Sequence, residues 1–318
     1  IVWDRIPFAA ANLVTAVSAV RSNLGLTFFA YSSLLVLGGW FIWWTATFFA
    51  YVYVAAECDN NGDCEGSVNG FVVFLFLISL YWTQQVIKNT VHTTVAGTVG
   101  TWWFRPDEAS SCCSSGVRDS FMRSVTLSFG SICFGSLIVA IIRAMKEFLH
   151  QARESGDGIL LCFAECLLGC LESLAEYFNQ WAFVYVGLYG YQFIEAGKNV
   201  MTLFKTRGWT TIITDNLIDN VLFMVSFGVG LITGLFAVLL CSSFGIVADA
   251  ISAGGPFVAG IIIGISLASV LMGVVGSAVN TVIVCYAEAP NEFQQNYPEL
   301  SNEMRGAWRQ AWPVEFTY

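Results

Sequence analysis

Four polar side chains stand at helical spacing inside one long apolar stretch of the sequence. Tyr81, Gln85, Lys88 and His92 follow one another at steps of four, three and four residues, so a helix would place them on one face. Lys88 and His92 are the only residues in the stretch 71–104 that carry or can carry charge. Because lipid rejects such a stripe, the pattern predicts a face turned toward protein or water. We expect Lys88 and His92 to act in gating or proton transfer; a hydrogen-bonded packing role is the alternative for His92.

The stretch that carries this stripe is long enough to cross a bilayer. Residues 71–104 contain no proline, and such a helix would extend about 50 Å at ~1.5 Å per residue, against a hydrocarbon core of roughly 30 Å. Its first part, FVVFLFLISLYW, is apolar on all sides, as a lipid-facing helix must be. Farther along, Ala96 and Gly100 repeat at a spacing that allows another helix to approach closely.

Aromatic side chains and one acid indicate which chemistry the stripe could serve. A quaternary ammonium group has no N–H to donate, so aromatic faces hold it best, at about 0.5–2 kcal/mol each when desolvated. A carboxylate inside the membrane adds charge compensation, and such groups are expensive and usually functional. The predicted substrate-binding residues are Trp43, Trp44, Tyr81, Trp82, Gln85, Tyr185, Tyr189 and Glu195. The alternatives are a lipid belt or core packing for each aromatic residue, and an ion pair of Glu195 with Lys198.

The composition is that of a membrane protein. The 318 residues are 56% hydrophobic and only 12% charged, with a mean hydropathy of +0.65, whereas soluble domains carry about twice that share of charge. A net charge of −9 argues against nucleic acid as a partner. The sequence contains no P-loop, G-x-S-x-G or H-E-x-x-H motif, and two histidines are too few for a histidine metal site. We therefore predict no enzyme, no cofactor and no metal.

Apolar runs of membrane length recur along the chain and predict an all-α, polytopic transmembrane helix bundle. The six expected spans are residues 26–56, 71–104, 124–145, 181–204, 215–241 and 257–286. Residues 5–22 predict an amphipathic helix at the cytoplasmic surface. Three glutamates make 159–178 a costly crossing, so we expect a surface or re-entrant helix there. Gly187 and Gly190 would allow the span that contains them to bend or break.

The charge of the loops predicts the topology. The loop 57–67 holds four acids and no Lys or Arg, which places it on the extracytoplasmic side. Within it, Cys58 and Cys64 flank an Asn-Gly turn at a spacing that suits a disulfide in an oxidising compartment; two unpaired thiols are the alternative.

The C-terminal part of the chain combines glycine-rich spans with a polar tail. Asp215 is expected to cap a helix, and glycines within the last two spans are expected to pack helices closely. Residues 287–318 are predicted to form a cytoplasmic C-terminal tail, with Trp308 and Trp312 as interfacial anchors.

Three blocks of the sequence point to a family. They are YWTQQVIKNTVHTTVAGTVGTWWF (81–104), NQWAFVYVGLYGYQFIEAGKNVMTLFKTRGWTTIITD (179–215) and SAVNTVIVCYAEAPNEFQQNYPELSNEMRGAW (277–308). They resemble the choline transporter-like family, in its fungal and protist branch, and the resemblance covers nearly the whole chain. It implies a transporter of choline-like cations, such as choline and ethanolamine, that works by alternating access and is facilitated or proton-coupled.

The resemblance also implies a larger protein. Members have about ten spans, so residues 1–318 would be the C-terminal part of such a transmembrane domain, with further spans before Ile1. The expected partners are a choline-like small cation and the lipid bilayer of the plasma membrane or an organelle. One alternative is a structural or accessory subunit of a larger assembly, with other membrane subunits as partners. Another is an ion or proton pathway through Lys88, His92 and Glu195.

Overall fold

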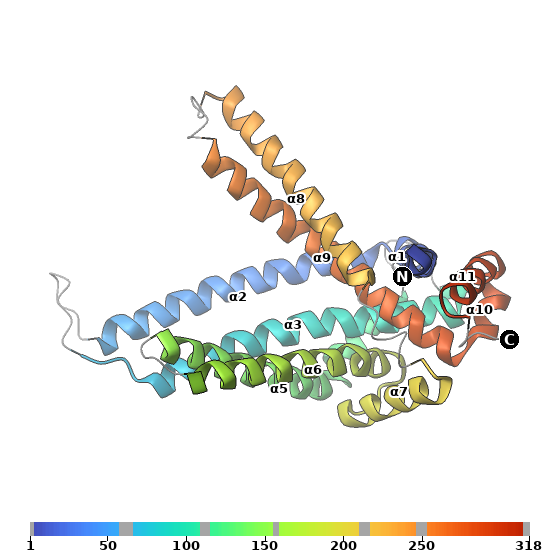
Figure 1. Cartoon of the computed structure of the whole chain (residues 1–318), viewed down its shortest axis with the longest axis horizontal. Coiled ribbons are helices and arrows are strands. Elements are labelled where there is room, and N and C mark those ends of the chain that lie inside the picture. The colour runs from blue at the N-terminus through green and yellow to red at the C-terminus, as the bar shows by residue number, and fades with distance from the viewer. Residues whose placement is uncertain are drawn as a thin grey trace. The chain divides into compact units, whose positions relative to one another are not determined.

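The computed structural model describes residues 3–56, 66–108, 115–154, 159–209, 217–245 and 253–313. Every element in these ranges is a helix (Figure 1), so the predicted all-α class is confirmed. The α-helices are α1 (Ile6–Ser22), α2 (Gly25–Ala55), α3 (Gly70–Phe104), α4 (Ser115–Val125), α5 (Phe129–Glu154), α6 (Ile159–Tyr189), α7 (Phe193–Arg207), α8 (Leu217–Ser243), α9 (Gly254–Glu288), α10 (Pro290–Asn296) and α11 (Pro298–Ala311). Short 3₁₀ turns occupy Trp3–Arg5 and Pro106–Glu108. The predicted disulfide of Cys58 with Cys64 and the cap at Asp215 lie outside the described residues.

Four of these helices, α2, α3, α8 and α9, are long and apolar enough to cross a membrane, by length and composition. Their ends agree to within three residues with the predicted spans 26–56, 71–104, 215–241 and 257–286. Helices α4 and α5 pass the same test together as one span bent by 65°, which raises the number to five among the described residues. The predicted span 124–145 contains this bend, because α4 ends at Val125 and α5 begins at Phe129.

The region after α5 differs from the prediction. Residues 159–178 are not a separate surface or re-entrant helix, because they continue without interruption into the first part of the predicted span 181–204 as α6. The span 181–204 is itself broken, since α6 ends at Tyr189 and α7 begins at Phe193. Gly190, with φ 74°, adopts the left-handed conformation that glycine tolerates at no steric cost. The predicted break at a glycine within the span 181–204 is therefore present at Gly190, whereas residues 159–178 and 181–189, which were predicted to be separate, form one helix.

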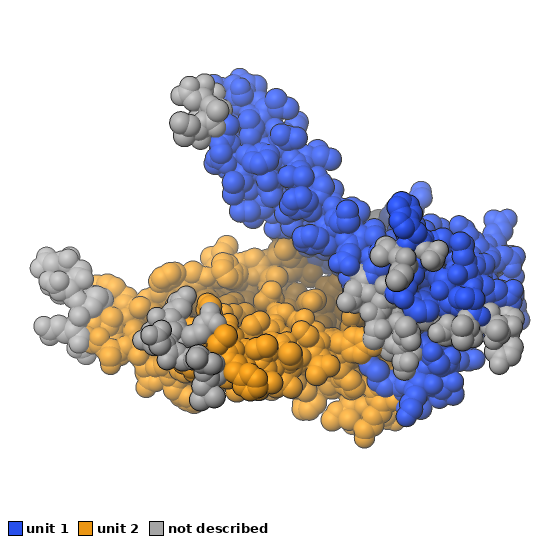
Figure 2. Space-filling model, viewed as in Figure 1, with its two compact units in different colours: residues 1–31, 95–118, 201–318 blue, residues 32–94, 119–200 orange. Residues whose placement is uncertain are grey.

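The chain divides into two compact units, which are described separately (Figure 2). Unit 1 comprises residues 1–31, 95–118 and 201–318, and unit 2 comprises residues 32–94 and 119–200. Helices α2, α3, α4 and α7 contribute residues to both. All of the predicted substrate-binding residues, together with Lys88 and His92, belong to unit 2.

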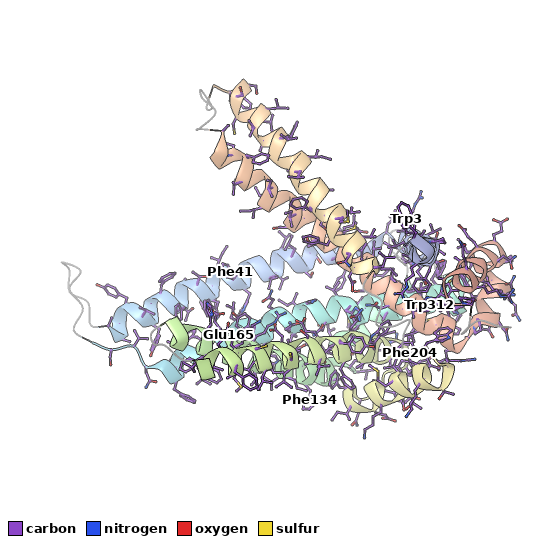
Figure 3. All side chains as sticks on the ribbon, viewed as in Figure 1. Trp3, Phe41, Phe134, Glu165, Phe204 and Trp312 are labelled. Carbon is purple, nitrogen blue, oxygen red and sulfur yellow. The ribbon has the colours of Figure 1, made fainter. Side chains whose placement is uncertain are left out.

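Unit 1 has an aromatic core built from both ends of the sequence. Trp308 of α11 is fully buried, with its ring 5.0 Å from that of Phe8 and 4.8 Å from that of Trp209. Trp312, labelled in Figure 3, is 6% exposed, and the guanidinium of Arg5 lies 4.6 Å from its ring centre. The prediction that these two tryptophans are interfacial anchors is therefore wrong. Helix α11 packs its apolar face on α1, and this contact buries Trp308 against Phe8.

The polar tail 287–318 contains helices that attach to the end of α3. Asn296 Nδ2 donates to the Trp103 carbonyl at 2.8 Å, and the Tyr297 hydroxyl donates to the Trp102 carbonyl at 3.3 Å. The Tyr297 ring stacks on Trp102 with centroids 4.2 Å apart. Burial, and secondarily the nearby carboxylate of Asp107, raise the pKa of Tyr297 to about 12, because both disfavour the phenolate.

Glycines allow the helices α8 and α9 to pack closely against each other. A Cβ added to Gly230 would lie 2.5 Å from Ile265 Cγ1, and one added to Gly264 would lie 2.6 Å from Thr233 Oγ1. Real Cβ atoms essentially never come that close, so these positions require glycine. The predicted close packing is confirmed at Gly230 and Gly264, whereas Gly228 has nothing within 4 Å of its added Cβ.

Candidate functional site

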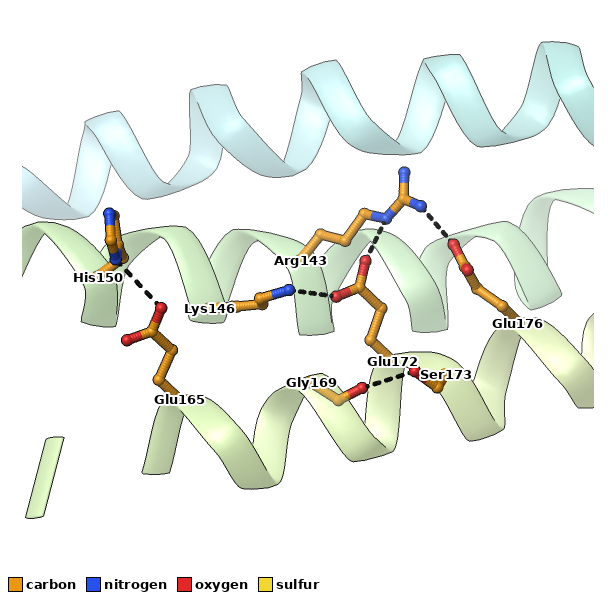
Figure 4. Close-up of polar contacts among 8 residues, drawn as sticks. All are labelled: Arg143, Lys146, His150, Glu165, Gly169, Glu172, Ser173 and Glu176. Carbon is orange, nitrogen blue, oxygen red and sulfur yellow. Dashed lines mark hydrogen bonds and ion pairs between the residues drawn. The ribbon is translucent and has the colours of Figure 1, made fainter. Parts of the chain in front are cut away.

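An ion-pair ladder joins α5 to α6 (Figure 4). Its members are Arg143, Lys146 and His150 on α5, and Glu165, Glu172 and Glu176 on α6. Arg143 donates from Nε to Glu172 Oε1 at 2.8 Å and from Nη2 to Glu176 Oε1. Lys146 donates to the second oxygen of Glu172 at 3.0 Å. Glu172, 16% exposed, thus has two cationic partners, and both of its carboxylate oxygens accept a hydrogen bond.

The ladder explains how α6 carries three glutamates. A glutamate without a partner is costly inside a membrane, but each one here faces a basic side chain of the neighbouring helix. The fourth contact joins His150 Nδ1 to Glu165 Oε1 at 3.1 Å. This pairing was not predicted from the sequence, although the bases and the acids lie at similar distances on either side of residues 155–158. That symmetry is the signal expected of an antiparallel helix pair with complementary charge.

The polar stripe of α3 lies partly inside unit 2. Gln85 is 3% exposed, and His92 is half-buried with Nε2 2.9 Å from the carbonyl oxygen of Gln180 on α6. Tyr81 lies within electrostatic reach of the ladder. Lys88 is exposed. The contact of His92 is the one expected of a hydrogen-bonded packing residue, and the gating role of Lys88 and His92 stays a prediction.

A neighbouring face of α3 adds polar contacts that the sequence analysis left out. Asn89, 7% exposed, donates from Nδ2 to Ser136 Oγ on α5 at 2.9 Å. One turn farther, Thr94 Oγ1 lies 3.4 Å from Ser124 Oγ on α4. Asn89 follows Gln85 by four residues, so the helical spacing that revealed the stripe extends to it. These contacts fix α3 against α4 and α5.

The predicted tryptophans lie at helix–helix contacts or on the surface. Trp44 on α2 donates its indole N–H to the Phe76 carbonyl at 3.0 Å and to Ser79 Oγ at 3.1 Å, both on α3. Trp82 on α3 donates to the Cys133 carbonyl of α5 at 3.0 Å. Trp43 is 70% exposed. The indole N–H groups of Trp44 and Trp82 therefore join helices. No contact among the described residues brings the rings of Trp43, Trp44 and Trp82 together.

Three tyrosines gather where α6 ends. The rings of Tyr185 and Tyr189 lie 5.2 Å apart, that of Tyr191 lies 6.3 Å from Tyr185 and 5.9 Å from Tyr189. Tyr185 is 5% exposed, Tyr189 44% and Tyr191 38%. The predicted pair Tyr185 and Tyr189 is thus brought together, and Tyr191 joins it because the chain turns at Gly190. We call these three residues the tyrosine cluster. Tyr191 was absent from the predicted site, since a continuous helix would have turned it to another face.

Glu195 lies in the first turn of α7, just beyond the same break. Its side chain is exposed. The N-terminal end of a helix carries a partial positive charge that stabilises a carboxylate there, by about 0.3–1 kcal/mol at an exposed position. The break thus places an aromatic cluster at the end of one helix and an acid at the start of the next.

Arg123 connects the two broken segments of unit 2. It lies at the end of α4, and its Nη2 donates to the carbonyl oxygen of Gly187 in the last turn of α6 at 2.9 Å. Its own carbonyl accepts hydrogen bonds from Leu127 and Ser128, which form the bend between α4 and α5. One arginine therefore contacts both the α4–α5 bend and the last turn of α6, the helix that carries Tyr185 and Tyr189.

The described residues contain no group of three His, Cys, Asp or Glu side chains placed to hold a metal ion. The cysteines at 162, 166 and 170 are exposed on α6. The break between α6 and α7 offers π faces, the carboxylate of Glu195 and the C-terminal end of a helix, all of which attract cations.

Comparison with known proteins agrees with the resemblance seen in the sequence. A family model described as plasma-membrane choline transporter matches residues 1–291. Protein PNS1 of Gibberella zeae is 32% identical over 320 residues, which cover 95% of this chain and 58% of that protein. Protein PNS1 of Mycosarcoma maydis is 32% identical over 321 residues, covering 96% of this chain and 60% of that protein.

A relative from outside the fungi matches in the same way. A CTL-like protein of Dictyostelium discoideum is 31% identical over 301 residues, which cover 93% of this chain and 52% of that protein. The chain thus spans between 52% and 60% of the length of these relatives. With helices of membrane length and a family match over most of its residues, the chain is an integral membrane protein that belongs to the plasma-membrane choline transporter family, a family of transporters and not of enzymes.

Proposed function

We propose that the chain forms part of a transporter that carries choline-like organic cations, such as choline and ethanolamine, by alternating access. The observation that carries this proposal is the tyrosine cluster at the break between α6 and α7, whose ring centres lie 5.2 to 6.3 Å apart. A cation held within about 6 Å of several ring centres gains electrostatic attraction from each of them. The description of the matching family supports the same substrate class.

The electrostatics of the break favour a cation. The C-terminal end of a helix carries the equivalent of roughly −0.5 elementary charge, and Tyr185 and Tyr189 lie in the last turns of α6, with Tyr191 just beyond its end. Glu195, in the first turn of α7, adds a full negative charge three residues after Gln192. The phenol hydroxyls can exchange hydrogen bonds with the hydroxyl of choline, which the trimethylammonium end cannot do. We assign Tyr185, Tyr189 and Glu195 as the main substrate contacts, with Tyr191 beside them.

The two helix breaks suit alternating access. Broken membrane helices commonly form the substrate sites of transporters, because their unwound backbone lines the site and absorbs the change in shape. In unit 2 the breaks are the 65° bend between α4 and α5 and the turn at Gly190. The ion-pair ladder ties α5 to α6 as a pair, so we assign the movement to α4 and α7, on the far sides of the breaks.

The other predicted contacts keep secondary roles in this proposal. Trp82, Gln85 and Tyr81 follow one another along α3 and would line the route to the site, together with Trp43 and Trp44 of α2. Lys88 and His92, farther along α3, would act in gating or in proton transfer. Transport is either facilitated or proton-coupled under this scheme.

The topology follows from the charge of the loops. We propose that the C-terminal tail, residues 287–318, is cytoplasmic and that the acidic loop 57–67 is extracytoplasmic, where Cys58 and Cys64 form a disulfide. The membrane is the plasma membrane, in agreement with the description of the family. Thiol labelling from outside intact cells, with and without a reductant, tests the loop and the disulfide together.

The first test is uptake of labelled choline into proteoliposomes that hold the full-length protein. We expect saturable uptake that unlabelled ethanolamine competes. An imposed pH gradient changes the rate if protons are coupled and leaves it unchanged if transport is facilitated. Uptake that stays flat at every pH, with folded protein in the vesicles, would reject the proposal and favour the structural-subunit alternative.

The second test addresses the site. Glu195→Gln removes one negative charge and should raise KM about tenfold, the equivalent of about 1.4 kcal/mol. Glu299→Gln is the matched control, since Glu299 is an exposed glutamate in the first turn of α11, in unit 1. An equal effect of both changes would contradict the role of Glu195.

Trp82 allows the aromatic face to be separated from the hydrogen bond. Trp82→Phe keeps a ring but loses the donor to the Cys133 carbonyl, whereas Trp82→Ala loses both. If the ring lines the substrate route, uptake persists in the Phe variant and is lost in the Ala variant. Unchanged uptake in both Trp82→Ala and Glu195→Gln would reject the assignment of these residues.

A further inference from the structure

We propose that Arg123 is a tethered cation that occupies the end of α6 when no substrate is bound. A choline-like cation displaces it from there. The proposal rests on the function proposed above and concerns how the site is kept closed and made selective. In it, the guanidinium of Arg123 competes with the substrate for the same negative helix end.

The position of Arg123 is the first argument. Its Nη2 donates to the Gly187 carbonyl at 2.9 Å, within the last turn of α6. The last carbonyl groups of a helix have no partner inside the helix and form the negative end of its dipole, which is where a cation is best placed. Gly187 lies between Tyr185 and Tyr189 in the sequence of α6, so the guanidinium and two members of the tyrosine cluster share the last turns of this helix.

The way in which Arg123 is held is the second argument. It stands two residues before the end of α4, and its carbonyl accepts hydrogen bonds from Leu127 and Ser128 in the bend that joins α4 to α5. The neighbouring Ser124 is 2% exposed and contacts Thr94 of α3. The backbone of Arg123 is therefore fixed, while its half-buried side chain reaches across to another helix.

The charge balance is the third argument. A guanidinium cannot lose its proton in a protein, so Arg123 holds a permanent positive charge against the end of α6. A second cation at the same helix end would be repelled unless the guanidinium moves away. The hydrogen bond between Arg123 and Gly187 spans from one broken segment to the other, so its release frees α4 from α6 at the time when substrate enters. Displacement of Arg123 thus couples binding to movement at both breaks.

The test is equilibrium binding of labelled choline to the purified full-length protein. Arg123→Gln removes the competing charge and should tighten choline binding about tenfold, since a hydrogen bond to a charged group is worth about that factor. Binding of 3,3-dimethyl-1-butanol, the neutral isostere of choline, should change by less than twofold. Arg123→Lys keeps the charge and should bind choline as the unchanged protein does. Arg105→Gln is the control for net charge, because Arg105 pairs with Glu108 on the exposed surface of unit 1.

The outcomes separate this inference from the proposed function. If the unchanged protein binds no choline, the proposed function fails. If the unchanged protein binds choline but Arg123→Gln binds it equally or more weakly, the inference is overturned. It is also overturned if the affinities for choline and for 3,3-dimethyl-1-butanol change by the same factor, since Arg123 is then only a structural link.

A measurement on the unchanged protein covers the case in which Arg123→Gln does not fold. Phenylglyoxal modifies accessible arginines, and mass spectrometry reports the extent at Arg123. Choline should speed modification of Arg123 severalfold, while 3,3-dimethyl-1-butanol at the same concentration should not. Slower or unchanged modification in the presence of choline would contradict displacement.

Discussion

Two helix pairs in this protein are held together in opposite ways. Helices α8 and α9 of unit 1 meet at glycines, where the nearest atom of the other helix would lie 2.5 to 2.8 Å from an added Cβ. Helices α5 and α6 of unit 2 meet through the ion-pair ladder, with nitrogen–oxygen contacts of 2.8 to 3.1 Å along three of its four pairs. Both pairs are antiparallel and sequential in the chain, so the difference lies in the side chains alone.

The difference reflects what each pair has to do. Lipid gives helices little hydrophobic reason to associate, so close van der Waals packing or polar contacts must supply the attraction. Glycine contacts act over a short range and hold one geometry. Charged contacts act over a longer range and tolerate small shifts, but they need a partner for every charge. The glycine pair is therefore suited to a fixed support, and the charged pair lies in the unit that contains both helix breaks.

The largest expected effect comes from filling the glycine contact. Gly264→Leu would place a side chain where Thr233 and Gly230 already lie, and should destabilise the protein by about 3 kcal/mol or more. Gly228→Leu is the matched control, because nothing lies within 4 Å of its added Cβ. Thermal unfolding with size-exclusion chromatography measures both. Equal stability of the two variants would mean that glycines do not hold α8 to α9.

A smaller effect is expected from removing one acid of the ladder. Glu172→Gln leaves Arg143 and Lys146 without their shared carboxylate and should cost about 1–3 kcal/mol, less than for a fully buried pair because Arg143 is 25% and Lys146 42% exposed. Glu165→Gln, the same change on the same helix, removes the contact with His150, which carries charge only when protonated, and should cost less. Thermal stability in a fixed detergent compares the two. A larger loss for Glu165→Gln would contradict the central place of Glu172.

The smallest expected effect is on how the stability of the protein changes with pH, and it does not involve the glycine contact between α8 and α9. The pKa of Tyr297 is raised to about 12, chiefly by burial and also by Asp107, so the folded state favours the neutral phenol. This stabilisation is complete below pH 10 and is lost as the pH rises from 10 toward 12, because the unfolded tyrosine ionises first. Tyr297→Phe should flatten this part of the stability curve.

The control for this prediction removes a comparable hydroxyl. Tyr31 also donates to a backbone carbonyl at 3.3 Å, that of Leu267, so Tyr31→Phe matches the loss of one hydrogen bond. Melting temperatures measured between pH 9 and 12 should fall less steeply in Tyr297→Phe than in Tyr31→Phe. Parallel curves of melting temperature against pH for the two variants would show that Tyr297 does not cause the loss of stability at alkaline pH.

Local sequence patterns were sufficient to predict much of the fold. Apolar length alone located α2, α3, α8 and α9, because lipid leaves a spanning chain few options other than a helix. The stripe of α3 was visible from spacing, and Gln85 and His92 are the two members that face protein most closely. The sequence also contained the glycine that ends α6, since Gly190 can take a positive φ without strain.

Partners distant in sequence escaped the same reasoning. Glu172 was seen as a cost to a membrane helix because its cations lie 26 and 29 residues away on α5. Trp308 was assigned to the interface because nothing local reveals that Phe8, at the other end of the chain, lies against it. Tyr191 was left out of the site because only the turn at Gly190 brings it beside Tyr185.

The sequence by itself determined the class of this protein: the long apolar runs require membrane helices, and the three conspicuous blocks identify the choline transporter family. Only the tertiary structure decided which charges are neutralised, which tyrosines meet, and that Arg123 reaches the end of α6. The physical reason is the distance along the sequence over which each property is set. Helix formation and lipid exposure depend on residues a few positions apart, whereas the worth of a charge or an aromatic ring depends on what the fold places next to it.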